Sequence, residues 1–148
     1  MRSEPQLSLQ TAAIDGYPIA YAEAGQGAPM VLIHGSLCDC RYWKPQLGPL
    51  GRSFRVLAPS LRHYWPETWD GAGDDFSVVR HAQDIVEFIE NVCGEPAHLV
   101  GHSRGGRVAL ETALRRPTWP ARWCWPIRAC RCPAATTRAA DSANARWR

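Results

Sequence analysis

The chain has 148 residues, of which 45% are hydrophobic and 21% are charged, a balance typical of one globular domain and not of a disordered chain. It has no run of about 18 apolar residues, and its first residues lack the apolar segment of a secretory signal, so we expect a cytoplasmic protein without a membrane span. The net charge of +3 arises in residues 119–148, where six arginines and one aspartate give +5. Residues 1–118 have eleven basic and thirteen acidic residues and a charge of −2. Charge alone therefore gives no reason to expect that residues 1–118 bind nucleic acid.

Four apolar or alternating segments predict strands. The stretch "LSLQTAAIDGYPIAYAEAG", 7–25, is predicted to form two strands around Asp15-Gly16, because this dipeptide adopts the positive φ angles of a tight hairpin. Short continuous apolar runs follow at 28–36, 54–60 and 95–103, and such runs are typical of strands buried on both faces.

Helical patterns separate these strands. Residues 77–93 place apolar side chains at 3.6-residue spacing behind Ser77, a good N-cap, and residues 104–116 form a second helical pattern. Residues 41–50 predict a short helix or irregular turn, and residues 61–76 a loop. The alternation of strands and helices predicts an α/β fold with a parallel sheet.

The pentapeptide Gly101-His102-Ser103-Arg104-Gly105 fits G-x-S-x-G and lies between a predicted strand and a predicted helix. A sharp turn there lifts the Ser103 hydroxyl above the sheet, and Gly101 and Gly105 keep Cβ atoms out of the crossing. The start of the helix offers free N–H groups to a developing oxyanion. Ser103 is therefore a candidate nucleophile, with a structural serine in a turn as the alternative.

With "VLIHGS", "FRVLAPSLR" and "LVGHSRGG" in this order, the sequence resembles the α/β-hydrolase family over about residues 6–118. The resemblance implies the N-terminal half of an α/β-hydrolase sheet, a hairpin followed by parallel strands with flanking helices. It implies that Ser103 attacks a small-molecule ester or similar carbonyl compound. It also implies an oxyanion hole made by the backbone N–H groups of Arg104 and Ser36, with Leu37 behind Ser36. We expect no cofactor, no metal, no nucleic acid and no membrane.

Two other site types fit less well. The glycines of "GHSRGG" stand at its first, fifth and sixth positions, so Ser103 replaces the close-approach glycine of a dinucleotide site. Epoxide hydrolases and dehalogenases would resemble the same fold with aspartate in place of Ser103. Asp70, Asp74 and Asp75 lie in a glycine-rich stretch without regular ligand spacing, which indicates a solvated loop and not a metal site.

The other polar residues near the motif have structural interpretations. We expect His34 and His102 to be packed beside the serine turn and not to act as bases. His63 and His81 are interpreted as surface or loop residues. The Arg104 side chain is expected to be solvated, with contact to an acidic substrate as the alternative.

The catalytic set is incomplete. A serine nucleophile needs a base and a carboxylate that orients it, and in this family they follow the serine as an acid and then a histidine. After Ser103 the only acids are Glu111 and Asp141, and no histidine follows. We therefore expect the chain to be nearly inactive. The alternative is a non-catalytic fragment with a basic interaction tail.

Residues 119–148 do not continue the pattern. They contain four tryptophans, three cysteines, six arginines and eight alanines but no leucine, valine or glycine. A zinc site at Cys124, Cys130 and Cys132 would lack a fourth ligand. A nucleic-acid-binding arm remains possible from charge alone. We predict that this segment is disordered and adds no paired strand.

A shift of reading frame explains this composition. In the frame that begins at the third base of each codon, every new codon joins one base of a residue to two bases of the next residue. Because tryptophan has one codon and cysteine only two, Trp123-Cys124 must then give valine, Cys124-Trp125 leucine and Trp125-Pro126 alanine. With GC-rich codons, the stretch from Arg122 to Cys132 becomes an apolar strand followed by a turn. We therefore predict a one-base frameshift near residue 118, which the nucleotide sequence tests.

Overall fold

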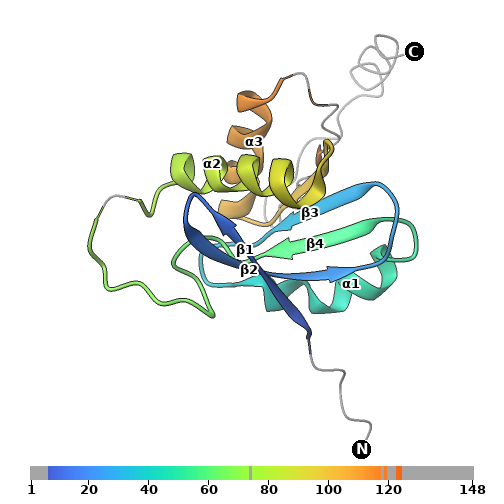
Figure 1. The fold of residues 1–148 in the computed structure, drawn as a ribbon, viewed down its shortest axis with the longest axis horizontal. Coiled ribbons are helices and arrows are strands. Elements are labelled where there is room, and N and C mark those ends of the chain that lie inside the picture. The colour runs from blue at the N-terminus through green and yellow to red at the C-terminus, as the bar shows by residue number, and fades with distance from the viewer. Residues whose placement is uncertain (1–6, 74, 118, 120–122, 125–148) are drawn as a thin grey trace, which may run out of the picture.

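The computed structural model describes residues 7–73, 75–117, 119, 123 and 124, which form a mixed sheet with helices on both faces (Figure 1). The strand order is β1-β2-β4-β3-β5-β6. The strands are β1 (Leu9–Ile14), β2 (Tyr17–Ala24), β3 (Pro29–Ile33), β4 (Arg55–Pro59), β5 (His98–Gly101) and β6 (Trp123–Cys124). The helices are η1 (Cys40–Trp43), α1 (Lys44–Leu50), α2 (Val78–Phe88), η2 (Ile89–Cys93) and α3 (Arg104–Arg115). Within the described ranges, no helix has the length and apolar character needed to cross a bilayer.

The predicted hairpin is confirmed. β1 pairs antiparallel with β2, and Ile14 lies opposite Tyr17 across a two-residue turn. Asp15 and Gly16 in that turn have φ angles of 47° and 70°, as a turn that follows the twist of the strands requires.

The parallel centre of the sheet is confirmed as well. β3 pairs parallel with β4 on one side and with β5 on the other. The carboxyl ends of these three strands therefore lie at the same edge of the sheet. Ligands of open α/β sheets bind beyond such an edge, so the segments that follow these strands position the candidate site.

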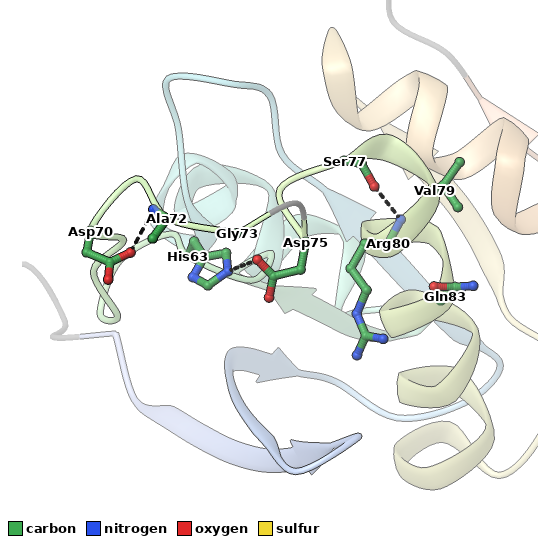
Figure 2. A pocket seen from close by; sticks show the side chains of 9 residues that line it. All are labelled: His63, Asp70, Ala72, Gly73, Asp75, Ser77, Val79, Arg80 and Gln83. Carbon is green, nitrogen blue, oxygen red and sulfur yellow. Dashed lines mark hydrogen bonds and ion pairs between the residues drawn. The ribbon is translucent and has the colours of Figure 1, made fainter.

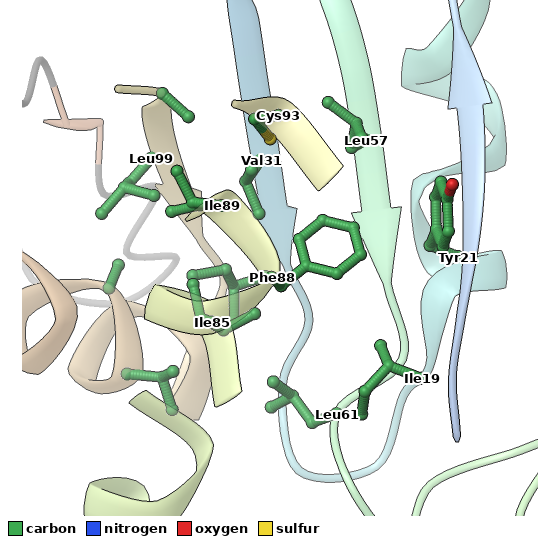
Figure 3. Packing of buried hydrophobic residues seen from close by; sticks show 14 of the residues in the cluster. Ile19, Tyr21, Val31, Leu57, Leu61, Ile85, Phe88, Ile89, Cys93 and Leu99 are labelled. Carbon is green, nitrogen blue, oxygen red and sulfur yellow. The ribbon is translucent and has the colours of Figure 1, made fainter. Parts of the chain in front are cut away.

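Side chains of the central strands alternate between two apolar layers. Val31 and Ile33 belong to the cluster beneath α2, whereas Leu32 faces the layer that contains Leu47 of α1. In the first layer the Phe88 ring of α2 lies among strand residues (Figure 3) and is fully buried. Burial on both faces explains why these strands appear in the sequence as continuous apolar runs.

The expectation that residues 119–148 add no paired strand is wrong. β6 pairs parallel with β5, with Trp123 opposite Leu99 and Cys124 opposite Val100. A ladder is made by backbone groups, so the free edge of β5 can hold a short strand that has no aliphatic sequence. Trp119 also packs against the main apolar cluster. The predicted disorder of the rest of this segment lies outside the described residues.

A buried ion pair fixes the loop after β4 to α2. The Arg62 guanidinium donates two hydrogen bonds of 2.9 Å to the two carboxylate oxygens of Asp84, whose side chain is 2% exposed. These bonds to Asp84 raise the pKa of Arg62 above its usual value. Two buried charges are tolerated when they pair in such a bidentate geometry. The Arg62–Asp84 pair thereby fixes the position of residues 61–64 beside the sheet.

Candidate active site

Ser103 occupies the turn between β5 and α3 in a strained backbone conformation. Its φ and ψ angles are 54° and −118°, and its side chain is exposed. A residue other than glycine is rarely found at such angles, and strain of this kind concentrates at functional sites. The predicted geometry of the serine turn is therefore present.

Two glycines make that turn possible. A Cβ atom on Gly105 would overlap the carbonyl oxygens of Ile33 and His34, and one on Gly101 would lie 2.5 Å from backbone atoms of Gly106. The first turn of α3 thus lies directly on the ends of β5 and β3. No side chain larger than hydrogen fits at either position.

The loop after β3 closes against the serine. A Cβ atom on Gly35 would lie 2.9 Å from His102 Nδ1 and 3.2 Å from Ser103 Cβ. The Cys38 N–H donates to the Gly35 carbonyl, which makes a tight turn with Ser36 and Leu37 at its centre. Both central residues are exposed, and the Leu37 side chain is 100% exposed.

Free backbone N–H groups remain at this junction. The N–H groups of Gly105 and Gly106 donate to the carbonyls of His102 and Ser103. Within the described residues, the N–H groups of Arg104 and Ser36 have no such acceptor. These are the two groups for which the resemblance implies a role as oxyanion-hole donors.

His34 is a structural residue of this loop. Its Nδ1 donates to the Gly35 carbonyl at 2.8 Å, and its Nε2 accepts from the Leu61 N–H at 3.0 Å. Burial lowers the pKa of the ring from 6.5 to about 4. With both nitrogens engaged and the ring neutral, His34 holds the loop and cannot take a proton from Ser103.

His102 is packed beside the serine turn, as expected. Its ring stacks on Tyr42 with centroids 4.6 Å apart and an interplanar angle of 22°. All five histidines of the chain are described, and none of them forms a hydrogen bond with Ser103. Among the described residues, the structure therefore places the serine beside its candidate oxyanion donors and gives its hydroxyl no histidine partner.

The interpretation of His81 as a surface or loop residue is wrong. His81 lies on α2 and is fully buried. Its Nε2 donates to the Arg62 carbonyl at 3.2 Å, which leaves Nδ1 as an acceptor for Arg104 Nη2 at 3.3 Å. Burial, aided by the charge of Arg104, lowers the pKa of His81 to about 4. The signal was present in the sequence, since His81 lies four residues before Ile85 on the apolar face.

The expectation of a solvated Arg104 side chain also needs correction. The side chain is only partly exposed, and its guanidinium carbon lies 5.0 Å from the centroid of the Phe76 ring. Its position is defined by Phe76 in the loop before α2 and by His81 on α2. The residue after the candidate nucleophile thus carries a positioned charge.

The acidic loop forms no metal site among the residues described. Asp70 accepts from the Ala72 N–H, and Asp75 accepts a 2.8 Å hydrogen bond from His63, which has a φ angle of 67°. These residues line an open cavity of about 700 Å³ together with Arg80 (Figure 2). Ser103 is not among its lining residues, so this cavity is separate from the candidate active site. Asp74 lies outside the described residues.

Comparison with known proteins agrees with the fold. The model of the "Alpha/beta hydrolase family" matches residues 30–147. The acetyltransferase component of the acetoin cleaving system of Cupriavidus necator is 36% identical over 74% of this chain and 29% of its own length. A soluble epoxide hydrolase of a Corynebacterium species is 31% identical over 71% of this chain and 36% of its own length. A solved membrane phospholipase A superposes with a TM-score of 0.74 at 27% identity, over 80% of this chain and 39% of the other.

The chain therefore spans about a third of the length of the curated relatives it matches. The match to the family model covers more than half of the chain and includes residues of the basic segment 119–148.

Replacing Gly105 by alanine should destabilise the fold by about 3 kcal/mol or more, because the added methyl group overlaps two carbonyl oxygens. Urea unfolding followed by tryptophan fluorescence measures this loss. Arg107→Ala is the control, since Arg107 lies exposed on the same helix and should change the free energy of unfolding by less than about 0.5 kcal/mol. A Gly105→Ala chain as stable as the parent would contradict the close contact between α3 and β3.

The buried histidines should make stability depend on pH. His34 and His81 stay neutral in the folded chain down to about pH 4, whereas in the unfolded chain they take up protons near pH 6.5. The unfolded state therefore binds more protons between these values, and the free energy of unfolding should fall as the pH is lowered through this window. Each ring contributes about 3 kcal/mol at most. Urea titrations at pH 7.5 and 4.5 test this, and His81→Gln should reduce the difference.

Proposed function

The chain belongs to the alpha/beta hydrolase family, and on that premise we propose that Ser103 is the nucleophile of an acyl-transfer enzyme that acts on an ester or similar carbonyl compound. The observation that carries the proposal is the exposed, strained Ser103 between β5 and α3. A purely structural serine would gain nothing from a φ angle of 54°, which costs of order 1–3 kcal/mol.

The surrounding backbone suits the charge that such a reaction develops. Attack of Ser103 Oγ on a carbonyl carbon moves negative charge onto the carbonyl oxygen. The free N–H groups of Arg104 and Ser36 would donate to that oxygen, and the positive end of the α3 dipole would favour it further. Each donor of this kind typically lowers the barrier by about 3 kcal/mol. Collapse of this intermediate breaks the ester C–O bond and expels the alcohol, which takes up the proton lost by the Ser103 hydroxyl. Water then hydrolyses the acyl-enzyme, which releases the acid and restores the Ser103 hydroxyl.

The names of the relatives cover epoxide hydrolysis, phospholipid hydrolysis and acetyl transfer. Serine at position 103 favours carbonyl chemistry, because the resemblance implies aspartate at this position in epoxide hydrolases. An acyl-enzyme on Ser103 is common to ester hydrolysis and to transfer of an acyl group to another acceptor. Hydrolysis is the simpler proposal because water needs no acceptor site.

We also propose that the chain as written lacks its general base. None of its histidines forms a hydrogen bond with Ser103, and no histidine follows Ser103 in the sequence. The predicted frameshift near residue 118 would explain this absence. Support comes from β6, because Trp123–Cys124 pairs with β5 where the other frame encodes valine and leucine.

A fluorophosphonate probe tests the nucleophile and the base together. The chain as written should be labelled slowly, at Ser103 alone, and Ser103→Ala should remove the labelling. A gene with one base corrected near codon 118 should give a product that is labelled about 10²-fold faster or more, since a general base contributes 10²–10⁴.

The exposed Ser53 provides the control, because Ser53→Ala should leave the labelling rate unchanged. Rapid labelling of the chain as written would show that it already holds a base. If neither product is labelled, the alternative of a non-catalytic fragment with a basic tail gains support.

The second oxyanion donor has its own test. Ser36→Pro removes the N–H group but fits the second position of the Gly35–Cys38 turn, where proline is favoured. It should slow phosphonylation of Ser103 by about 10²-fold. Ser36→Ala keeps the N–H group and should react like the parent. Equal rates for the two variants would show that Ser36 is not a donor.

A further inference from the structure

We propose that the Arg104 guanidinium forms an anion-binding subsite beside Ser103, so that the substrate carries a carboxylate next to its reacting carbonyl group. The preferred substrate class is then the monoester of a dicarboxylic acid, or an equally short anionic ester. This inference rests on the proposed function for the role of Ser103, but the anion site itself does not require Ser103 to react.

The charge of Arg104 is not neutralised within the part of the chain that the structure describes. Six of the nine described arginines form ion pairs with carboxylates: Arg41, Arg55, Arg62, Arg80, Arg115 and Arg116. The three without such a partner are Arg52, Arg104 and Arg107. Arg52 and Arg107 are exposed to water, which solvates their charge, whereas Arg104 is partly buried. A partly buried cation without a counter-ion is unfavourable unless a ligand supplies the anion.

The neighbours of Arg104 hold the guanidinium in place but cannot neutralise it. His81 Nε2 donates to the Arg62 carbonyl, and His81 Nδ1 accepts from Arg104 Nη2 at 3.3 Å, so Nδ1 carries no proton and the ring is neutral. The Phe76 ring lies beneath the guanidinium, 5.0 Å from its central carbon. Such a contact favours a cation and leaves its edge free for hydrogen bonds.

Two polar groups in this cluster have no hydrogen-bond partner among the described residues. Arg104 Nε and the Tyr64 hydroxyl are both buried and unpartnered. They belong to one cluster, because the Tyr64 ring also contacts Phe76, with centroids 5.4 Å apart, and His81, with centroids 6.0 Å apart. Since Nε is closed to solvent while the side chain is partly open, an anion would meet the guanidinium at its Nη groups.

The position of Arg104 in the chain links this charge to the proposed chemistry. Its own N–H is a candidate oxyanion donor, and its side chain departs from the first residue of α3, directly after Ser103. The guanidinium is therefore joined to the residue next to Ser103 by a single arginine side chain. The proposed substrate is accordingly short, with a carboxylate two carbons from its ester group.

The test compares monomethyl succinate with methyl butyrate, which has the same ester and chain length but no charge. Binding to the chain as written is followed by the side-chain Nε–H signals of arginine in ¹H–¹⁵N NMR spectra at low salt. The Arg104 signal is identified by its absence in Arg104→Lys. Monomethyl succinate should shift this signal saturably, and methyl butyrate should not. Higher salt should weaken the binding.

Variants complete the test. Arg104→Gln should weaken the binding of monomethyl succinate at least tenfold, and Arg104→Lys should bind with intermediate affinity because it keeps the charge but loses the planar fork. Arg107→Gln removes an exposed arginine from the same helix and should bind within twofold of the parent. If Arg104→Gln fails to fold, the comparison of the two esters on the parent chain still decides the question.

The outcomes separate this inference from the proposed function. A shifted Arg104 signal in a chain whose Ser103 is never labelled would support the anion site and reject the nucleophile. Labelling of Ser103 without any response of Arg104 to monomethyl succinate would overturn the anion site alone. Equal responses to the two esters would overturn it as well.

Discussion

The contact of three backbone segments at Ser103 is the constraint on which the rest of the site depends. The end of β5, the first turn of α3 and the loop after β3 meet at Gly101, Gly105 and Gly35. Gly101 and Gly105 lie directly against backbone atoms, and Gly35 lies against His102 and Ser103. This contact forces Ser103 to a positive φ angle and leaves the Arg104 N–H without an acceptor among the described residues. The same backbone proximity therefore accounts for both the exposure of the hydroxyl and the free donors beside it. Stability and candidate chemistry are determined here by the same atoms.

The electrostatics of the site follow from burial. His34 and His81 are enclosed by the sheet, α2 and the loop after β4, so both rings stay neutral. Their hydrogen bonds to the backbone hold the neighbouring loops in place. Arg62 is neutralised by Asp84, but Arg104 has no carboxylate partner among the described residues. The region beside Ser103 thus combines a helix N-terminus, free N–H groups and one positioned cation. All three favour negative charge, as the tetrahedral intermediate of acyl transfer requires.

Much of the fold could be predicted from the sequence because its main elements are locally determined. Asp15-Gly16 specifies its own turn, and the continuous apolar runs at β3, β4 and β5 leave few alternatives to buried parallel strands. The missed features depend on contacts distant in sequence. His81 is polar by residue type, and only the packing of α2 against residues 62 and 104 shows that its two nitrogens are satisfied. The pairing of β6 was missed because backbone ladders form independently of side-chain composition.

The β6 ladder depends on backbone groups, whereas a general base depends on one correctly placed side chain. Parallel pairing with β5 satisfies N–H and C=O groups, and two residues of almost any sequence can provide that. A general base is different, because it needs one particular side chain held about 2.6–3.2 Å from Ser103 Oγ and oriented by a third group. None of the five histidines meets this condition, and the two nearest in sequence to the candidate oxyanion donors, His34 and His102, are already committed to packing. The β6 ladder therefore supplies no base by itself, and under the proposed frameshift the base would be encoded in the other frame after codon 118.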